Sequence, residues 1–377
     1  MANKHRRYGN SRTGTKSFFM RKLIIILLFA ALFITACKKE IAETKTATET
    51  RLANALNAPA PCTGNTWVNH QNFPPTAYQG YFPLFYNNKA YFFNSSLQRI
   101  YIYNGTSWDS VSSSIPQFGH TDYNWREFRF TLGNKGYIGA KFYNGQGKLT
   151  NYFWEYNFDV NTWMPKAKFS GPAREGVSTF SNGGKGYIVG GVSYSTSNSY
   201  YTNYKDTWEY DQLTNSWTKK ADLPVALGYA GGFSIGSKGY IVNGAYWNRE
   251  NDIVFRSNLY EYNTQTDAWS LKAPFPGAGR LKPSVFVISG LAYVGGGKDD
   301  FYAFSHQDYY KYNPATNSWG TIASLTATLA YYDDLMLNFS LNSQGYAIYR
   351  QQNIDDGLYK YKVFKYTPQN CNTGTSQ

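Results

Sequence analysis

Residues 185–191 read KGYIVGG, residues 207–211 read TWEYD, and residues 215–217 read NSW. The first run suits a buried strand that ends at a Gly pair. The second run alternates aromatic and charged residues with a period of two, and Asn215-Ser216 is typical of a turn before a third strand. Together these runs predict one small antiparallel sheet.

The same unit recurs along the chain. The strand Tyr recurs at spacings of 46, 50, 53, 53 and 53 residues. A second Tyr and a Trp recur with it. The markers are Tyr91, Tyr137, Tyr187, Tyr240, Tyr293 and Tyr346; Tyr103, Tyr156, Tyr210, Tyr262, Tyr312 and Tyr366; and Trp67, Trp108, Trp163, Trp217, Trp269 and Trp319. A period near fifty residues with six copies predicts an all-β, six-bladed β-propeller.

One closed domain over residues 62–371 accounts for most of the 377 residues. The last repeat runs from Gly345 to Tyr366 and lacks a Trp strand, whereas Asn65-Thr66-Trp67 stands alone before the first repeat. The N-terminal strand is therefore predicted to complete the sixth blade and close the ring, which leaves no long open sheet edge. Cys62 and Cys371 lie at the two ends of this domain, and we expect them to form a disulfide after export.

The N-terminus has the pattern of an exported chain. Met20-Arg21-Lys22 precedes an apolar stretch too short to span a bilayer, and small residues precede Cys37. Residues 1–36 therefore resemble a lipoprotein signal peptide, with Met20 as an alternative start, and Cys37 is the expected lipidated residue. The alternative is a plain secretory signal. Residues 37–61 have no strand period and predict a tether, and residues 372–377 a short tail.

The formal net charge of +13 does not indicate nucleic-acid binding. Residues 1–36 contain seven Lys or Arg and no acid, so the remaining chain has 30 basic and 24 acidic residues. No Lys/Arg run could follow a phosphate backbone. No phosphate loop, zinc spacing, nucleophile elbow or Ca²⁺ loop is present either, so we expect no metal and no cofactor.

The connections form two sets, because loops between blades and loops between second and third strands emerge on one face of a four-stranded meander. Here that set is long: 191–205, 244–257, 297–307, 350–360 and 117–125. Long loops on a rigid scaffold are where binding usually occurs. Their aromatic residues could stack on sugar rings, although a chain with 19% aromatics exposes some by chance. They are Tyr194, Tyr200, Tyr201, Tyr246, Trp247, Phe301 and Tyr302.

Residues 62–371 resemble the kelch superfamily. The Gly pair of that pattern is present at 190–191 and 295–296, is altered in the second and fourth repeats, and is absent from the first and sixth. The resemblance implies a kelch-type propeller, and propellers of one fold host many functions. Galactose oxidases within this superfamily hold copper with two His and two Tyr. This chain has only His70, His120 and His306 after the signal, scattered, which argues against a copper oxidase.

Bacterial sialic-acid mutarotases are also six-bladed kelch proteins, and resemblance to them implies an acid/base group and a cation for a sugar carboxylate. Arg126-Glu127 and Arg174-Glu175 stand at similar positions before innermost strands, as does Arg280, with Asp333 at the sixth repeat. We predict ligand contacts from Arg126, Arg174, Arg280, Tyr229, Trp247 and Tyr302, and acid/base candidates Glu127, Glu175 and Asp333. The alternative is that these residues hold inter-blade turns together.

The sequence therefore predicts a monomeric lipoprotein of the bacterial cell envelope, at the outer membrane or cell surface. Its predicted role is a non-catalytic binding module that recognises a glycan or a protein on the long-loop face. A sugar-modifying enzyme that resembles a sialic-acid mutarotase is the first alternative, and a structural envelope protein is the second.

Overall fold

The computed structural model describes residues 64–70, 81–95, 97–116, 127–143, 149–195, 199–300, 305–326, 334–352 and 359–369. All of them belong to one compact unit, Thr63–Asn370. The other unit consists of Met1–Cys62 and Cys371–Gln377 and contains no described residue. No helix in the described ranges is long and apolar enough to cross a membrane.

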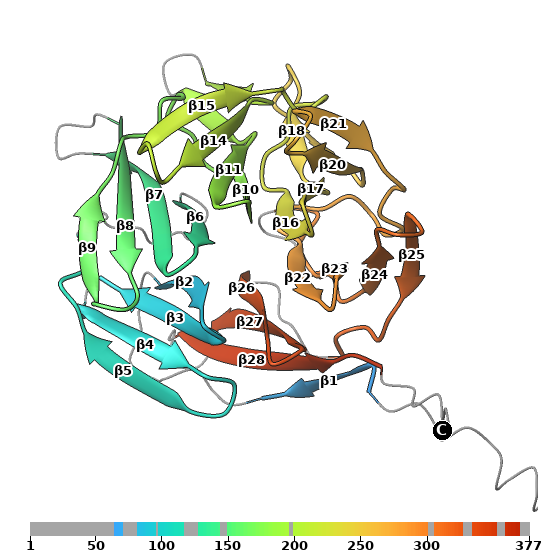
Figure 1. Cartoon of the computed structure of the whole chain (residues 1–377). Coiled ribbons are helices and arrows are strands. Elements are labelled where there is room, and N and C mark those ends of the chain that lie inside the picture. The colour runs from blue at the N-terminus through green and yellow to red at the C-terminus, as the bar shows by residue number, and fades with distance from the viewer. Residues whose placement is uncertain are drawn as a thin grey trace, which may run out of the picture. The chain divides into compact units, whose positions relative to one another are not determined.

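Figure 1 shows the described strands as a ring of six four-stranded antiparallel sheets, the blades. Blade 1 contains β2 (Tyr81–Tyr86), β3 (Lys89–Asn94), β4 (Arg99–Tyr103) and β5 (Trp108–Ser112). Blade 2 contains β6 (Glu127–Leu132), β7 (Lys135–Tyr143), β8 (Leu149–Asn157) and β9 (Thr162–Pro165). Blade 3 contains β10 (Ser178–Asn182), β11 (Lys185–Val189), β14 (Thr207–Asp211) and β15 (Ser216–Lys220).

Blade 4 contains β16 (Gly231–Ile235), β17 (Lys238–Val242), β20 (Leu259–Asn263) and β21 (Ala268–Leu271). Blade 5 contains β22 (Ser284–Ile288), β23 (Leu291–Gly295), β24 (Tyr309–Asn313) and β25 (Ser318–Thr321). Blade 6 contains β26 (Asp334–Leu341), β27 (Gln344–Gln352), β28 (Tyr359–Thr367) and, as its outer strand, β1 (Thr66–Asn69). The predicted six-bladed propeller is confirmed.

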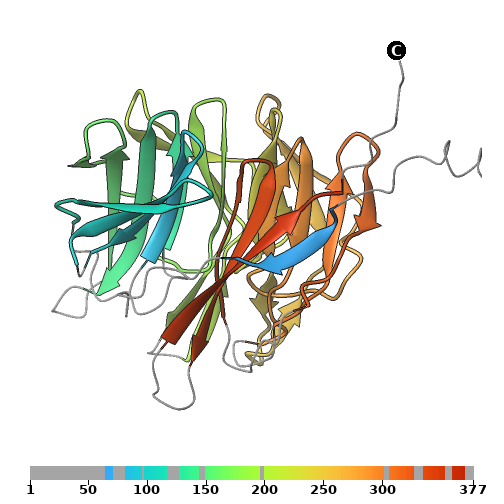
Figure 2. The ribbon, with the colours of Figure 1, turned by 90° about the horizontal axis from the view of Figure 1, so that it is seen from below.

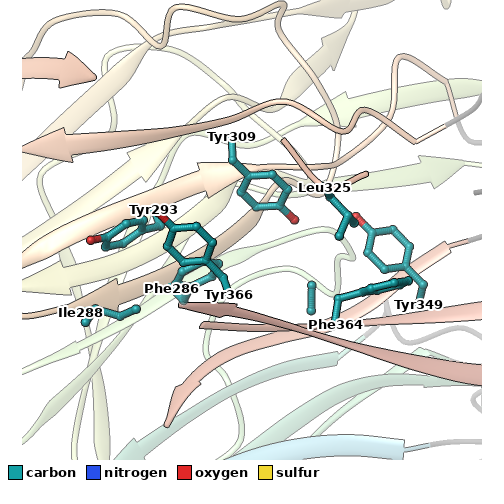
Figure 3. Packing of buried hydrophobic residues seen from close by; sticks show 9 residues of the cluster. Phe286, Ile288, Tyr293, Tyr309, Leu325, Tyr349, Phe364 and Tyr366 are labelled. Carbon is teal, nitrogen blue, oxygen red and sulfur yellow. The ribbon is translucent and has the colours of Figure 1, made fainter. Parts of the chain in front are cut away.

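Large rings from one blade fill the space above a glycine of the next. Four of the six marker Tyr residues follow a Gly, and two of these glycines show why: a methyl group on Gly186 would lie 2.1 Å from the Phe130 ring, and one on Gly239 would lie 2.2 Å from Phe180. Phe180 in turn stacks on Tyr187 at 4.6 Å and 13°. Figure 3 shows the corresponding contact between blades 5 and 6, where Phe286, Tyr293 and Tyr366 meet.

The Asn-Ser-Trp motif connects neighbouring blades. Asn215 has a left-handed backbone (φ 49°), and its Oδ1 accepts hydrogen bonds from Tyr210 in its own blade (2.9 Å) and from the Ala167 amide of blade 2 (2.9 Å). Trp217 Nε1 donates to the carbonyl of Ala167 at 3.0 Å. Asn215 thus accepts a hydrogen bond from the amide of Ala167, and Trp217 donates one to the carbonyl of the same residue. We call this arrangement, in which an Asn and a Trp bind one residue of the preceding blade, the Asn–Trp clamp.

The ring closes through the N-terminal strand, as predicted. β1 pairs antiparallel with β28 in the register Trp67↔Tyr366. The clamp is repeated across this closure, because Asn65 Oδ1 accepts from Tyr366 (3.0 Å) and from the Ala323 amide (2.8 Å), and Trp67 Nε1 donates to the Ala323 carbonyl (3.0 Å). Residues that are more than 250 positions apart in the chain thus make the same contacts as adjacent blades.

Two of the connections that the sequence analysis treats as loops contain strands. β12 (Val192–Ser195) pairs with β13 (Tyr200–Asn203), and β18 (Ala245–Trp247) pairs with β19 (Ile253–Phe255). Val192, Ala245 and Trp247 of these hairpins are buried in one cluster, and Tyr201, Ile253 and Phe255 pack against it, so apolar contacts hold both hairpins. Both hairpins extend from the connections between second and third strands, on the side that points down in Figure 2. We call this side the long-loop face and the opposite side the short-turn face.

Candidate functional site

Blades 3, 4 and 5 carry a second layer on the long-loop face. Backbone bridges join the segment before each innermost strand to the connection that follows the second strand: Glu175↔Val192, Gly228↔Ala245 and Leu281↔Lys298. The bridges hold these connections, two of which form the hairpins, against the segments that lead to the innermost strands. The side chains of these segments are therefore fixed by the scaffold rather than carried on unpaired loops.

Four aromatic rings lie in sequence between the two hairpins, and we call them the aromatic stack. Tyr194 and Tyr201 have ring centroids 4.8 Å apart, Tyr201 stacks on Trp247 at 4.7 Å and 22°, and Trp247 meets Tyr229 edge-on at 5.9 Å. Trp247 and Tyr229 are each 5% exposed, whereas Tyr194 is 41% exposed. The stack therefore runs from a buried base to a ring that solvent reaches.

The amide of Asn203 fixes the distance between the hairpins. Its Nδ2 donates to the carbonyl of Trp247 (2.7 Å), and its Oδ1 accepts from the Trp247 amide (2.9 Å). These two bonds imitate one step of a β-ladder. Both polar backbone groups of Trp247 are satisfied, and the indole is held beneath Tyr201.

A carboxylate and an ammonium group stand at the base of the stack. Tyr229 donates its hydroxyl to Glu175 Oε1 at 3.2 Å, and Lys282 Nζ lies 5.8 Å from the Tyr229 ring centroid. Burial raises the pKa of Tyr201, and the negative charge of Glu175 raises it further. Glu175 is thus close to two tyrosines, and three adjacent blades contribute to one polar group.

The backbone at this position is constrained. Gly176, Tyr229 and Lys282 occupy equivalent places in three successive blades, with φ values of 62°, 56° and 48°. Tyr229 N donates to Gly176 O (2.6 Å), and Lys282 N donates to Tyr229 O (2.7 Å). Non-glycine residues rarely adopt this left-handed conformation, and they cluster at functional sites. This position of the fold therefore supports a functional assignment to Tyr229 and Lys282.

Arg174 and Arg280 are buried, with 5% and 0% of their surface exposed. Arg280 donates to both oxygens of Asp308 (2.7 and 2.9 Å), to Gly296 O (3.0 Å) and to Ala278 O (2.9 Å). Arg174 makes the same set of contacts with Asp206, Gly190 and Pro172. Their guanidinium groups face the protein, so the geometry favours the alternative in which these arginines hold the inter-blade turns.

The two aspartates are matched to these arginines. Burial alone would raise the pKa of Asp308, but hydrogen bonds and charge from Arg280 outweigh it, and the pKa lies below its usual range. The pKa of Asp206 is lowered in the same way by Arg174 and Trp208 against the effect of burial. Both carboxylates stay ionised at neutral pH and neutralise the buried cations.

The predicted site residues fall into three groups. Glu175, Tyr229 and Trp247 come together. Arg126, Asp333 and Tyr302 lie outside the described residues, as do Cys37, Cys62 and Cys371. The predicted equivalence of Glu127 and Glu175 is wrong. Phe130↔Tyr137 and Phe180↔Tyr187 are matching pairs, so Glu127 aligns with Val177, two residues later than Glu175.

Sequence reasoning missed Lys282, Asp206 and Asp308. A signal was present for each of them. Lys282 follows Tyr229 by 53 residues, the blade repeat, and each aspartate stands four residues before a marker Tyr. The described part of the chain contains no cluster of three or more His, Cys, Asp or Glu that could hold a metal ion.

Comparisons with known proteins support a kelch-type propeller. No protein-family model matches the chain. It is 28% identical to Kelch-like protein 25 of Xenopus tropicalis over 203 residues, 50% of this chain and 32% of that protein. It is 28% identical to human Kelch domain-containing protein 3 over 180 residues, 44% of this chain and 46% of that protein.

The chain is also 27% identical to N-acetylneuraminate epimerase of Haemophilus influenzae over 146 residues, 39% of this chain and 32% of that protein. These alignments span a third to a half of the curated relatives. The solved structure of YjhT matches with a TM-score of 0.58 at 15% identity, covering 78% of this chain and 94% of that chain. The structural match shows the fold.

Proposed function

We propose that this kelch-type propeller is a glycan-binding module that is anchored at the bacterial cell envelope. The aromatic stack is the observation that carries the proposal. Tyr194 and Tyr201 offer partly exposed rings above a base that is held by Trp247. Sugar rings have an apolar face that stacks on such surfaces, and their hydroxyl groups need hydrogen-bond partners at the rim.

Glu175 and Lys282, which stand at the base of the stack, are the polar partners for those hydroxyl groups. A carboxylate accepts hydrogen bonds from sugar hydroxyls, and an ammonium group donates them. The hairpins are held by backbone bridges, so little side-chain or loop entropy is lost when a ligand binds. Pre-organisation of this kind supports a binding role in which the protein itself does not react.

The two exposed tyrosines of hairpin β12–β13 give a matched test. Tyr194 and Tyr200 are 41% and 38% exposed and lie on opposite faces of the hairpin, because the register pairs Tyr194 with Tyr201 and Ser195 with Tyr200. We expect Tyr194→Ala to weaken glycan binding about tenfold, or about 1.4 kcal/mol. Tyr200→Ala should leave binding unchanged on the same glycan array. Equal effects of the two substitutions would refute the stack as the site.

Anchoring depends on Cys37, which lies outside the described residues. Two or more acyl chains hold a protein at a membrane stably, whereas one chain does so only marginally. We expect Cys37→Ser to move the protein to soluble fractions or to block processing. A variant that stays membrane-bound and normally processed would contradict the lipoprotein assignment.

A sugar-modifying enzyme is the second candidate, supported by the similarity to N-acetylneuraminate epimerase of Haemophilus influenzae. Glu175, with its hydrogen bond from Tyr229, is the group placed to transfer a proton. Exchange between sugar anomers, followed by NMR with and without the protein, tests this role. Acceleration that Glu175→Gln removes would favour the enzyme, and no acceleration would favour the binding module.

A further inference from the structure

We propose that Arg256 and Tyr246 form a subsite for an anionic group, a carboxylate or sulfate, of the bound glycan. The inference rests on the proposed function, and it assigns a residue that sequence analysis did not identify. Arg256 follows β19 at the end of hairpin β18–β19, which lies on the long-loop face of the propeller, as the aromatic stack does.

The guanidinium group of Arg256 is oriented but has donors to spare. Its carbon lies 5.1 Å from the centroid of the Tyr246 ring, and Nη2 donates to the Tyr246 hydroxyl at 3.3 Å. These are its side-chain contacts, and no carboxylate among the described residues pairs with it. Nε and Nη1 therefore keep their hydrogens for another acceptor, and a planar fork of this kind matches the two oxygens of a carboxylate or sulfate.

The backbone of Arg256 is fixed as firmly as its side chain is oriented. Its amide donates to Gly244 O at 2.9 Å, and Gly244 N donates to Arg280 O at 2.9 Å. Gly279 of blade 5 lies so close that a methyl group there would be 2.7 Å from the Arg256 backbone. Two blades thus fix the backbone of Arg256. Its half-buried side chain therefore extends from a Cα atom whose position is fixed.

The comparison with Arg174 and Arg280 makes the assignment specific. Those two guanidinium groups use their donors on aspartates and carbonyls inside the protein. Arg256 has the same chemistry without the internal partners. A ligand anion that the sequence analysis assigned to Arg174 and Arg280 is therefore expected at Arg256.

The position of Arg256 also indicates the size of the ligand. Trp247 and Tyr246 are neighbours in β18, so their side chains lie on opposite faces of the hairpin. The aromatic stack is on the Trp247 side and the anion subsite is on the Tyr246 side. We infer that one ligand fills both only by crossing the hairpin, which requires an oligosaccharide rather than a single sugar.

The test uses oligosaccharides that differ only in charge. Binding of a galacturonate tetramer and of its uncharged methyl ester to the full-length protein in detergent is measured by calorimetry, and a sulfated dextran oligosaccharide and plain dextran form a second pair. We expect each anionic probe to bind about tenfold more tightly than its neutral partner. The pair with the larger difference distinguishes a carboxylate from a sulfate ligand.

Arg256→Gln should remove that difference and leave neutral binding unchanged, and Arg256→Lys should restore part of it. Arg249→Gln is the matched control, because it removes the same charge from an exposed position in the turn of the same hairpin. Equal loss in both Gln variants would show non-specific attraction and overturn the subsite. Equal binding of the neutral and anionic probes would also overturn the anion subsite, but it would leave the proposed glycan-binding function intact. Failure of all four probes to bind would refute the proposed function itself.

Discussion

Arg174 shows how a single residue can be assigned wrongly to a surface role when only its sequence position is known. Removing one partner of a buried ion pair leaves the other charge unpaired, which typically costs about 3–5 kcal/mol. We expect Arg174→Ala to lower the free energy of unfolding by an amount in this range, measured by urea denaturation. Binding by the folded fraction should be unchanged. A variant as stable as the wild type would contradict the bracing role.

The ion pairs of Arg174 and Arg280 could have been predicted from the sequence, but the burial of the two arginines could not. The paired spacing of Arg174 with Asp206 and of Arg280 with Asp308 is visible in the sequence, since both aspartates precede a marker Tyr by four residues. Burial is not visible there, because it depends on how a connection 16 residues away folds over the arginine and accepts its Nη1 hydrogen. The same limit hid Arg256, because its sequence position does not show that no carboxylate of the described residues pairs with its guanidinium group.

The stability of the ring closure at β1 is expected to depend on pH, because His70 follows this strand. Its Nε2 shares a hydrogen bond with the Tyr103 hydroxyl of blade 1, and its ring meets Tyr346 of blade 6 edge-on at 5.8 Å. Burial lowers the pKa of His70, and the charge of Lys365 lowers it further, against a smaller opposing effect of a backbone hydrogen bond with Gly105. The folded protein therefore binds this proton less readily than the unfolded chain does.

The sign of the effect follows from linkage. Well above pH 6.5 the imidazole is neutral in both states, and its contribution to stability is complete. As the pH falls below 6.5 the unfolded chain takes up the proton first, so stability is lost. We expect the melting temperature of the wild type to fall more between pH 7.5 and pH 5 than that of His70→Gln. Parallel curves for the two proteins would exclude His70 as the cause.

The outer strands of blades 3, 5 and 6 each carry an Asn–Trp clamp. Asn215→Ala removes two hydrogen bonds and places alanine in a left-handed backbone, which together should cost about 2–4 kcal/mol. Blade 4 offers the natural control, because Asp267 makes the same contacts there, with Tyr262 at 2.6 Å and the Ala221 amide at 2.8 Å. Asn215→Asp should therefore cost much less than Asn215→Ala in thermal denaturation. Equal losses would indicate that the backbone conformation alone matters.

The repeated elements were the most predictable part of the chain. Marker Tyr, Asn and Trp residues make the same contacts in successive blades, so their spacing predicts the sheets and even the closure by β1. Hairpins β12–β13 and β18–β19 were not predicted, because their sequences share none of the marker residues, although both lie in the equivalent connection of their blades, with Val192 and Ala245 53 residues apart. The aromatic stack lies between these two hairpins, which is why its members could be named from sequence but their contacts could not.

The ring as a whole is closed by contacts between its two ends, and a disulfide would strengthen that closure. Gly64 lies against Pro368, where a methyl group would be 2.1 Å from the Pro368 carbonyl oxygen. Cys62 and Cys371 are two and three residues beyond this contact. A bond between them would close a loop around the entire propeller and could contribute about 5 kcal/mol in the chain-entropy model.

We predict that this disulfide forms in the exported protein. Thiol titration of unfolded, unreduced protein should find neither Cys62 nor Cys371 reactive, and reduction should lower the melting temperature. The double variant Cys62→Ser/Cys371→Ser serves as the control, since reduction should not affect it. Two reactive thiols in the oxidised protein would refute the pairing.

The direction of β1 brings both ends of the described chain to one face of the propeller. β28 runs from the long-loop face to the short-turn face, and β1 starts beside its end, with Thr66 opposite Thr367. The described chain therefore enters and leaves the propeller on the short-turn face, on the side away from hairpins β12–β13 and β18–β19. A label or a solid support attached beyond Thr66 or Thr367 thus joins the propeller on the face opposite the aromatic stack.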